Sequence, residues 1–499
     1  MSNQDLKNKI FKDSSVLLFG RLVQMLLQLI NGLLIPKLIS PLKYGLWRSL
    51  FIIYQYATFS NLGTYAAIGV EMPYLQGKAE QIKKERIKNN TFYFNVFISL
   101  FLGLCLIISS FFTYGQYSSF YRKGFVLFSI LIFFTNISDY YLQISRIEKQ
   151  FKLLSTLTII QVLSNLILSF FLLNKYENEL LLAISIIFSN LLLLSLAIPK
   201  FGIPKFFNIE LKEIFRLIRF GFPLLFNGIL LELFRSVDQL LIVFFFKPEA
   251  IGYYGLAIAI QRIGFLIPGV LASTTMPHIY EEYGKTGDIN KIASLFEKSL
   301  ILISIICTLT LITMQIFVPV LIRHYLHEYI ASIPILNILI TGMFSIGLLG
   351  LPEIIASITG KIPQLIKVQI FITSTLAILI FITIKLKYGI VEISCLTSFF
   401  YFIYTVLVLF IIYKTYLKRN LIIFYKITEL YLPYFYILLI YFIVNYFFNK
   451  IETNIWNDIM YSTFKLLVII LFYIPVLFLL DKKYSFIKII KDSIIKSHN

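Results

Sequence analysis

The stretch LLELFRSVDQLLIVFFFKPEAIGYYG, from Leu230 to Gly255, carries charged side chains inside an apolar run of helical length. The charges are Glu232, Arg235 and Asp238, and their neighbours are mainly leucine, isoleucine, valine and phenylalanine. A charge at the centre of a bilayer costs about 2.5–3.5 kcal/mol on insertion scales, so it usually faces a partner or a cavity. The stretch therefore predicts a membrane helix with one polar face.

Composition places the rest of the chain in the same class. Of the 499 residues, 58% are hydrophobic and only 14% are charged, whereas soluble domains carry about 25% charged residues. Apolar runs of about 18 residues or more predict membrane-spanning helices, and about fourteen follow one another, from 14–38 and 45–72 to 457–480. The sequence therefore predicts an all-α polytopic membrane protein with about 14 transmembrane helices.

The net charge of +19 is distributed unevenly along the chain. The N-terminus, the even-numbered connections and the C-terminus carry about three times as many Lys and Arg as the odd-numbered connections, which is the positive-inside pattern. It predicts a multi-pass protein with both termini in the cytoplasm. Because this topology accounts for the basic loops, such as Gly77–Lys88, we expect no nucleic-acid partner.

Two segments repeat a short pattern. Pro41 and Gly45 in SPLKYGLW correspond to Pro248 and Gly252 in KPEAIGYYG, 207 residues later, and EMPYLQGK and TMPHIYEEYGK follow in the same order. These matches indicate an internal duplication in which spans 1–6 recur as spans 7–12. Because six is even, the copies share one orientation and should be related by a pseudo-twofold axis along the membrane normal.

The duplication predicts the domain organisation. We expect one six-helix lobe over residues 1–215, a second over 216–415, and two extra helices with a cytoplasmic tail over 416–499. Two such lobes enclose a central cavity, and rocking about it gives the alternating access of a carrier.

Charges inside the spans concentrate on the first two spans of each repeat. These are Arg21, Arg48, Glu71, Glu232, Arg235, Asp238 and Arg262, while Asp139, Glu353 and Glu392 are scattered. Steps of three residues keep Glu232, Arg235 and Asp238 within an arc of about 120°. This ladder either neutralises itself and holds the bundle together or lines the cleft as a substrate or proton site.

Three of the arginines, Arg21, Arg48 and Arg262, have no acidic residue one turn away on the same helix. A guanidinium in a cavity suits a phosphate, which it binds through two parallel hydrogen bonds. Acidic residues on neighbouring helices and lipid headgroups are alternative partners. The chain contains no Walker A, Asp-x-Asp or His-Glu-x-x-His motif, so we expect neither an enzyme nor a metal site.

An ordered pattern of short motifs occurs in two parts of the chain. Between Phe220 and Ile263 the motifs are FGFPLL, VDQLLI and KPEAIGYYGLAIAIQRI, and between Leu33 and Ile68 they are LLIPKLISPLKYGLW and FSNLGTYAAI. The pattern resembles the two halves of polysaccharide-transporter flippases, which belong to the multidrug/oligosaccharidyl-lipid/polysaccharide exporter superfamily. The resemblance covers roughly residues 10–415. It departs from the family at Asn61, where an acidic residue is common, and at Glu71, where a basic residue is common.

The resemblance implies a flippase of the bacterial cytoplasmic membrane that moves an undecaprenyl-diphosphate-linked oligosaccharide to the outer leaflet for O-antigen or other surface polysaccharide. Its partners would be this lipid-linked glycan, membrane lipids, and polysaccharide polymerase or assembly proteins, with no cofactor beyond coupling to H⁺ or Na⁺. The predicted substrate-binding residues are Arg21, Arg48, Arg235 and Arg262. The predicted ion-coupling or charge-pair residues are Glu71, Glu232, Asp238 and Glu353.

Three other classes remain open. A peptidoglycan lipid-precursor flippase would share the helix number and the basic cavity. A multidrug or cation antiporter of the same superfamily would favour acidic cavity residues over arginines. A membrane polysaccharide polymerase or ligase would need a large outer loop with catalytic groups, and no connection here is long enough.

Overall fold

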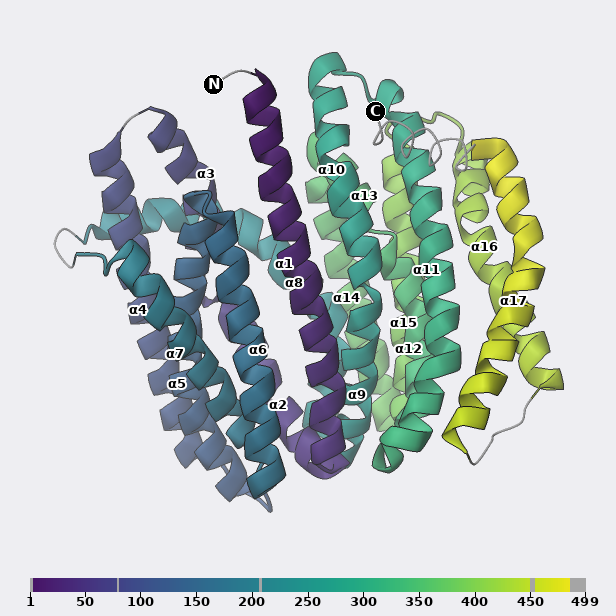
Figure 1. The fold of residues 1–499 in the computed structure, drawn as a ribbon, viewed down its shortest axis with the longest axis horizontal. Coiled ribbons are helices and arrows are strands. Elements are labelled where there is room, and N and C mark those ends of the chain that lie inside the picture. Colours follow the sequence, from purple (N-terminus) through teal and green to yellow (C-terminus); the bar gives the residue numbers. More distant parts are fainter. Residues whose placement is uncertain (1–2, 79, 206–208, 449–453, 485–499) are drawn as a thin grey trace. The chain divides into compact units, whose positions relative to one another are not determined.

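Every regular element in the computed structural model is a helix within the residues that it describes, 3–78, 80–205, 209–448 and 454–484 (Figure 1). This confirms the predicted all-α class. Helices satisfy their backbone hydrogen bonds within one segment, which is what an apolar bilayer requires of a crossing chain.

The helices form two compact units, Met1–Gly255 and Leu256–Asn499. The first unit contains α1 (Asn3–Leu38), α2 (Pro41–Ala57), the 3₁₀ turn η1 (Thr58–Asn61), α3 (Thr64–Gly77), α4 (Gln81–Phe111), α5 (Ser118–Ile147), α6 (Phe151–Tyr176), α7 (Leu181–Phe201), α8 (Leu211–Phe245) and the start of α9 (Pro248–Gly264). The second contains the end of α9, then α10 (Leu266–Thr286), α11 (Ile289–Tyr325), η2 (His327–Tyr329), α12 (Ser332–Gly347), α13 (Gly350–Ile358), α14 (Ile362–Lys385), α15 (Ile390–Tyr413), α16 (Asn420–Phe447) and α17 (Ile455–Tyr484). The predicted lobe limits at 215/216 and 415/416 describe the sequence repeat and stay a prediction.

The number of crossing helices depends on how broken helices are counted. In the described residues, 12 helices are long and apolar enough to cross a membrane, or 13 when the two parts of α8, bent by 48° at Pro223, form one span. The second predicted span is missing from this count because it is divided. After α2 and η1 the backbone is left-handed at Leu62 (φ 48°) and Gly63 (φ 89°) before α3 begins. Fourteen crossings therefore remain a prediction.

The helix limits recur at the spacing of the sequence motifs. α1 ends at Leu38 and α8 at Phe245, 207 residues apart, and α2 and α9 both have 17 residues and begin 207 residues apart. The same residue types thus begin and end helices at equivalent positions, as an internal duplication predicts.

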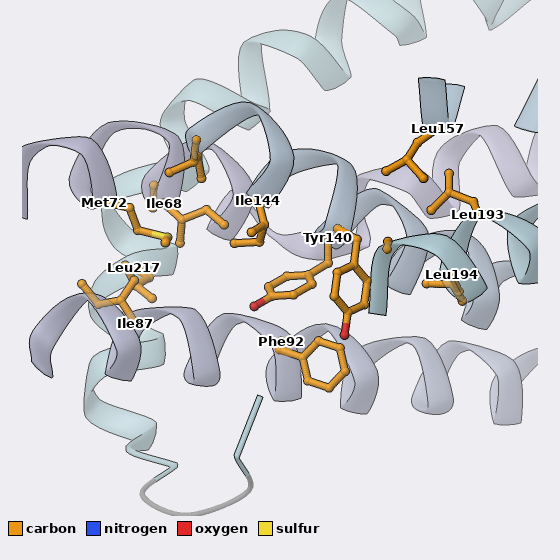
Figure 2. Packing of buried hydrophobic residues seen from close by; sticks show 14 of the residues in the cluster. Ile68, Met72, Ile87, Phe92, Tyr140, Ile144, Leu157, Leu193, Leu194 and Leu217 are labelled. Carbon is orange, nitrogen blue, oxygen red and sulfur yellow. The ribbon is translucent and has the colours of Figure 1, made fainter. Parts of the chain in front are cut away.

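The core of the first unit lies where α5 packs between α4 and α7. Tyr140 and Tyr141 are fully buried there beside Phe92, whose ring centroid lies 5.0 Å from that of Tyr140 (Figure 2). Both tyrosine hydroxyls donate to backbone carbonyls, Tyr140 to Lys88 at 3.3 Å and Tyr141 to Gly202 at 2.9 Å. Large rings whose polar ends are satisfied therefore pack the middle of the unit and hold the helix ends in place.

In the second unit, α16 and α17 pack against α11. Lys426 of α16 pairs with Glu297 at 2.7 Å near the start of α11, and Asp458 of α17 pairs with Arg323 at 3.1 Å near its end. The appended helix pair is thus tied to one helix at both ends.

The close crossing of α3 and α8 depends on two glycines. A Cβ atom on Gly221 would overlap the Gly63 carbonyl oxygen, whereas a Cβ on Gly228, also in α8, would lie 4.0 Å from its nearest neighbour, the ring of Phe59. Backbones can therefore approach at Gly221 only because it lacks a side chain.

We expect Gly221→Ala to lower the free energy of unfolding by about 1–3 kcal/mol, because the added methyl group forces α8 away from α3. The measurement is unfolding of the purified protein in detergent, followed by circular dichroism. Gly228→Ala is the matched control and should be neutral or stabilising, since alanine favours helix over glycine by about 1 kcal/mol. Equal stability of the two variants would contradict the tight crossing.

Candidate functional site

A row of polar contacts joins α2 to α8 in the middle of otherwise apolar helices. Arg48 Nη2 donates to Gln239 Oε1 at 3.0 Å, and Gln55 Nε2 donates to Glu232 Oε1. The Tyr56 hydroxyl oxygen lies 2.6 Å from Ser236 Oγ, and the Ser236 hydroxyl donates to the Glu232 backbone carbonyl. We call this row the α2–α8 polar seam; its members are Arg48, Gln55, Tyr56, Glu232, Ser236 and Gln239.

The register of the seam follows from helix geometry. Arg48 and Gln55 are seven residues apart on α2, and their partners Gln239 and Glu232 are seven residues apart in the opposite direction on α8. Seven residues are about two turns, so each helix returns the same face to its partner. The antiparallel helices α2 and α8 therefore make a second polar contact two turns away from the first.

Arg48 is half-buried and closed in by its neighbours. Its guanidinium lies 5.6 Å from the centre of the Phe51 ring and borders a cavity of about 10 Å³, which holds roughly one water molecule. The walls include Gln239 and Tyr254. This cavity is therefore too small for a diphosphate in the conformation described, which we call the closed seam.

The three charged residues of the Leu230–Gly255 stretch have different surroundings. Glu232 accepts from Gln55 of α2, whereas Asp238 is fully buried and accepts from the Tyr254 hydroxyl of α9 at 2.5 Å and from the Gln239 backbone N–H at 2.7 Å. Arg235 is half-buried on the same helix. Both carboxylates thus accept hydrogen bonds from neighbouring helices.

Beside Arg48, α2 and α9 meet through their first turns. A Cβ atom on Gly45 would overlap the Pro248 carbonyl oxygen, and a Cβ on Gly252 would overlap the Pro41 carbonyl oxygen. The two contacts are the same contact made in both directions, which a twofold axis between the two first turns produces. The proline and glycine residues that indicated the repeat in the sequence are therefore the ones that contact each other in the structure.

Other predicted residues lie elsewhere. In the first unit, the Glu71 carboxylate accepts hydrogen bonds from both terminal nitrogens of Arg216, at 2.7 and 2.6 Å. Arg216 also forms an ion pair with Glu213. Arg21 is exposed on α1. The structure thus brings Arg48, Glu232 and Asp238 to one region of the unit, with Arg235 on the same helix, and places Glu71 and Arg21 outside the seam.

Two predicted residues belong to the second unit. Arg262 is half-buried in the last turn of α9, and Glu353 is half-buried in the first turn of α13.

The sequence predictions did not include the uncharged residues of the site, which are Gln55, Tyr56, Ser236, Gln239 and Tyr254. A search for charges passes over amides and hydroxyls, although a buried polar group also needs a partner. The seven-residue spacing of Arg48 and Gln55, matched by Glu232 and Gln239, was a signal that could have found them.

The hydrogen bond between Tyr56 and Ser236 can be tested by a double-mutant cycle. Tyr56→Phe and Ser236→Ala each remove one partner, and we expect a coupling energy of about 0.5–1.5 kcal/mol between them, as for a neutral hydrogen bond. The measurement is unfolding in mixed detergent. Tyr56→Phe with Ser60→Ala is the control cycle and should be additive; additivity of both cycles would contradict the contact.

Comparison with known proteins gives the fold and the family. The structure is similar to the lipid II flippase MurJ in an inward closed conformation, with 14% identity and a TM-score of 0.67, over 94% of this chain and 100% of that one. It is also similar to the Vibrio cholerae MATE transporter VcmN, with 15% identity and a TM-score of 0.56, over 83% of this chain and 97% of that one. At these identities the likeness shows the fold alone. No curated protein matches the chain.

The family model described as "Polysaccharide biosynthesis protein" matches residues 10–281, which is more than half of the 499 residues. The chain belongs to this polysaccharide biosynthesis family of multi-pass membrane proteins.

Proposed function

We propose that the protein is a flippase that moves an undecaprenyl-diphosphate-linked oligosaccharide from the inner to the outer leaflet of the bacterial cytoplasmic membrane, for surface polysaccharide. The observation that carries the proposal is the seam itself. It holds the guanidinium of Arg48 between two apolar helices, next to the glycine contact of α2 and α9. Family membership supports the substrate class.

The chemistry of Arg48 suits a diphosphate. In the closed seam its partner Gln239 offers a neutral amide oxygen at 3.0 Å. Phosphate oxygens carry charge, and a guanidinium binds them through stronger, charge-assisted hydrogen bonds. When the seam opens, exchange of the amide for a phosphate is therefore favourable. Arg21 and Arg235, in the same unit, are proposed to line the same path, and Arg262 of the second unit stays a predicted substrate-binding residue.

Alternating access then follows from the glycine contact. With both termini in the cytoplasm, the first turns of α2 and α9 lie at the outer face and the Glu71–Arg216 pair lies at the cytoplasmic face. Opening toward the outside requires Gly45 and Gly252 to separate from the prolines. We propose coupling of this movement to an H⁺ or Na⁺ gradient.

A peptidoglycan lipid-precursor flippase is the second candidate. The observation that favours it is the likeness to the lipid II flippase MurJ, which extends over 94% of this chain. The family model favours the polysaccharide substrate instead. Both substrates can be compared in one flipping assay in reconstituted vesicles.

Replacement of the membrane arginines should block flipping. We expect Arg48→Ala, Arg235→Ala and Arg262→Ala each to lower flipping of a short-chain polyprenyl-diphosphate glycan by about ten- to a hundredfold, the loss of one charge-assisted contact. The measurement uses reconstituted vesicles and, in cells that lack the gene, display of surface glycan. Arg122→Ala, at an exposed position of α5, is the control.

Full display with both Arg235 and Arg262 removed would contradict the cavity assignment. Transport of lipid II in place of the oligosaccharide would favour the second candidate.

The glycine contact should set the balance between closed and open states. We expect Gly45→Ala or Gly252→Ala to destabilise the closed contact by about 1–3 kcal/mol, which raises the open population about fivefold or more. The measurement is labelling of an Ile52→Cys reporter, in a chain without Cys105, Cys307 and Cys395, by an impermeant maleimide added outside. Gly32→Ala is the control, since its added Cβ meets nothing within 4 Å. Unchanged labelling in the two variants would contradict the gate.

A further inference from the structure

A second polar region of the first unit surrounds Asp139 on α5. Thr135, Asp139, Gln143 and Arg146 recur at steps of four, four and three residues, so they share one face of the helix. Asp139 is half-buried, between Ser138 and Tyr140 on the chain. Within the described residues no hydrogen bond or ion pair of up to 4.0 Å joins its carboxylate to another side chain.

Hydrogen-bonded groups lie one turn to either side of this carboxylate. Before it, Thr135 accepts from the Tyr54 hydroxyl at 3.4 Å and from Asn190 at 3.2 Å, and Gln161 donates to Asn190 at 2.9 Å. These contacts join α2, α5, α6 and α7. They form a polar path in which hydroxyls and amides are satisfied by one another.

After Asp139, the path continues toward the end of α5. Gln143 donates to the Tyr65 backbone carbonyl at 3.2 Å and accepts from Arg146 at 3.0 Å. Asp139 is the one carboxylate on this face of α5, between the two hydrogen-bonded groups.

The titratable and charged groups that face Asp139 come from four helices. Tyr54 of α2, Tyr65 of α3 and Arg146 of α5 lie within electrostatic range of it, and Arg21 of α1 lies within range of Arg146. The facing polar groups of α6 and α7 are the amides Gln161 and Asn190. One cation, Arg146, and two phenols therefore lie within electrostatic range of this carboxylate, and the two amides lie near Thr135, one turn away.

We propose that Asp139 is the proton-carrying group that couples transport to a pH gradient; this rests on the proposed function. The step is a proton transfer alone: the carboxylate takes a proton from water on one side of the membrane, and the carboxylic acid returns it to water on the other. No other bond forms or breaks. Glu71, Glu232, Asp238 and Glu353 stay predicted ion-coupling or charge-pair residues, and the proposal adds Asp139 as the proton carrier.

The physical link to the substrate is competition for the same cation. A diphosphate at Arg21 repels an ionised Asp139 and competes with it for Arg146, the cation within electrostatic range of that carboxylate. Substrate binding therefore favours the protonated acid, and protonation favours substrate binding by the same factor.

The link to the movement is α2. Tyr54 of α2 reaches toward Thr135, one turn from Asp139, while the next two residues, Gln55 and Tyr56, contact α8 in the polar seam. A change of charge at Asp139 is thus felt by the helix that must move when the seam opens. A proton fits this site better than Na⁺, because hard metal cations need several oxygen ligands. The described residues hold no group of three or more Asp, Glu, His or Cys side chains that could bind a metal ion.

The test uses the full chain in lipid vesicles with a short-chain polyprenyl-diphosphate glycan. We expect a pH gradient to accelerate flipping by the wild type, and Asp139→Asn to reduce this acceleration to a ratio of about one while the rate without a gradient persists. Asp139→Glu should restore the acceleration. Glu392→Gln, which removes the carboxylate that caps α15, is the control and should respond like the wild type.

A second readout needs no substrate. Infrared difference spectra between two pH values should show a protonated-carboxyl band in the wild type and in Glu392→Gln that is absent from Asp139→Asn. Its persistence in Asp139→Asn would overturn the proposal, as would gradient-driven flipping by Asp139→Asn or acceleration by a sodium gradient that this variant abolishes. If the wild type flips no glycan, the proposed function fails, while the spectra still decide whether Asp139 takes up the proton.

Discussion

Close approach of helix backbones at glycine is the constraint on which the rest of the first unit depends. α8 meets α3 where Gly221 lies against Gly63, and α9 meets α2 where Gly252 and Gly45 lie against proline carbonyls. Between these two points α2 and α8 lie close enough for short polar side chains to reach across. A methyl group at either crossing would separate the helices and with them the partners of the seam.

Polar side chains in these apolar helices hydrogen-bond across the helix boundaries. Arg48 donates to an amide and Asp238 accepts from a phenol and a backbone N–H. Because the hydrogen bonds to the amide and from the phenol cross between helices, each one contributes to the cost of separating them.

One helix, α2, carries Arg48 and contacts both the seam partners on α8 and Thr135, one turn from Asp139 on α5. α2 turns Arg48 and Gln55 toward α8 and Tyr54 toward α5, and it is also the helix whose continuation is broken at Leu62 and Gly63. A break within a predicted span frees backbone groups and allows the two parts to tilt separately. The helix that carries the contacts is therefore also the one built to bend.

The sequence by itself determined the all-α membrane class, because apolar runs of this length can satisfy their backbones in a bilayer only as helices. It also determined the repeat spacing, which recurs in the ends of α1 and α8 and in the limits of α2 and α9. Only the tertiary structure decided the partners. Glu71 binds Arg216, which is 145 residues away along the chain, and Arg48 binds Gln239, which is 191 residues away. The tertiary structure also decided that the second span is divided. Helical periodicity reports which face of one helix is polar, whereas the choice of partner depends on which remote backbones approach, and glycine packing sets that approach.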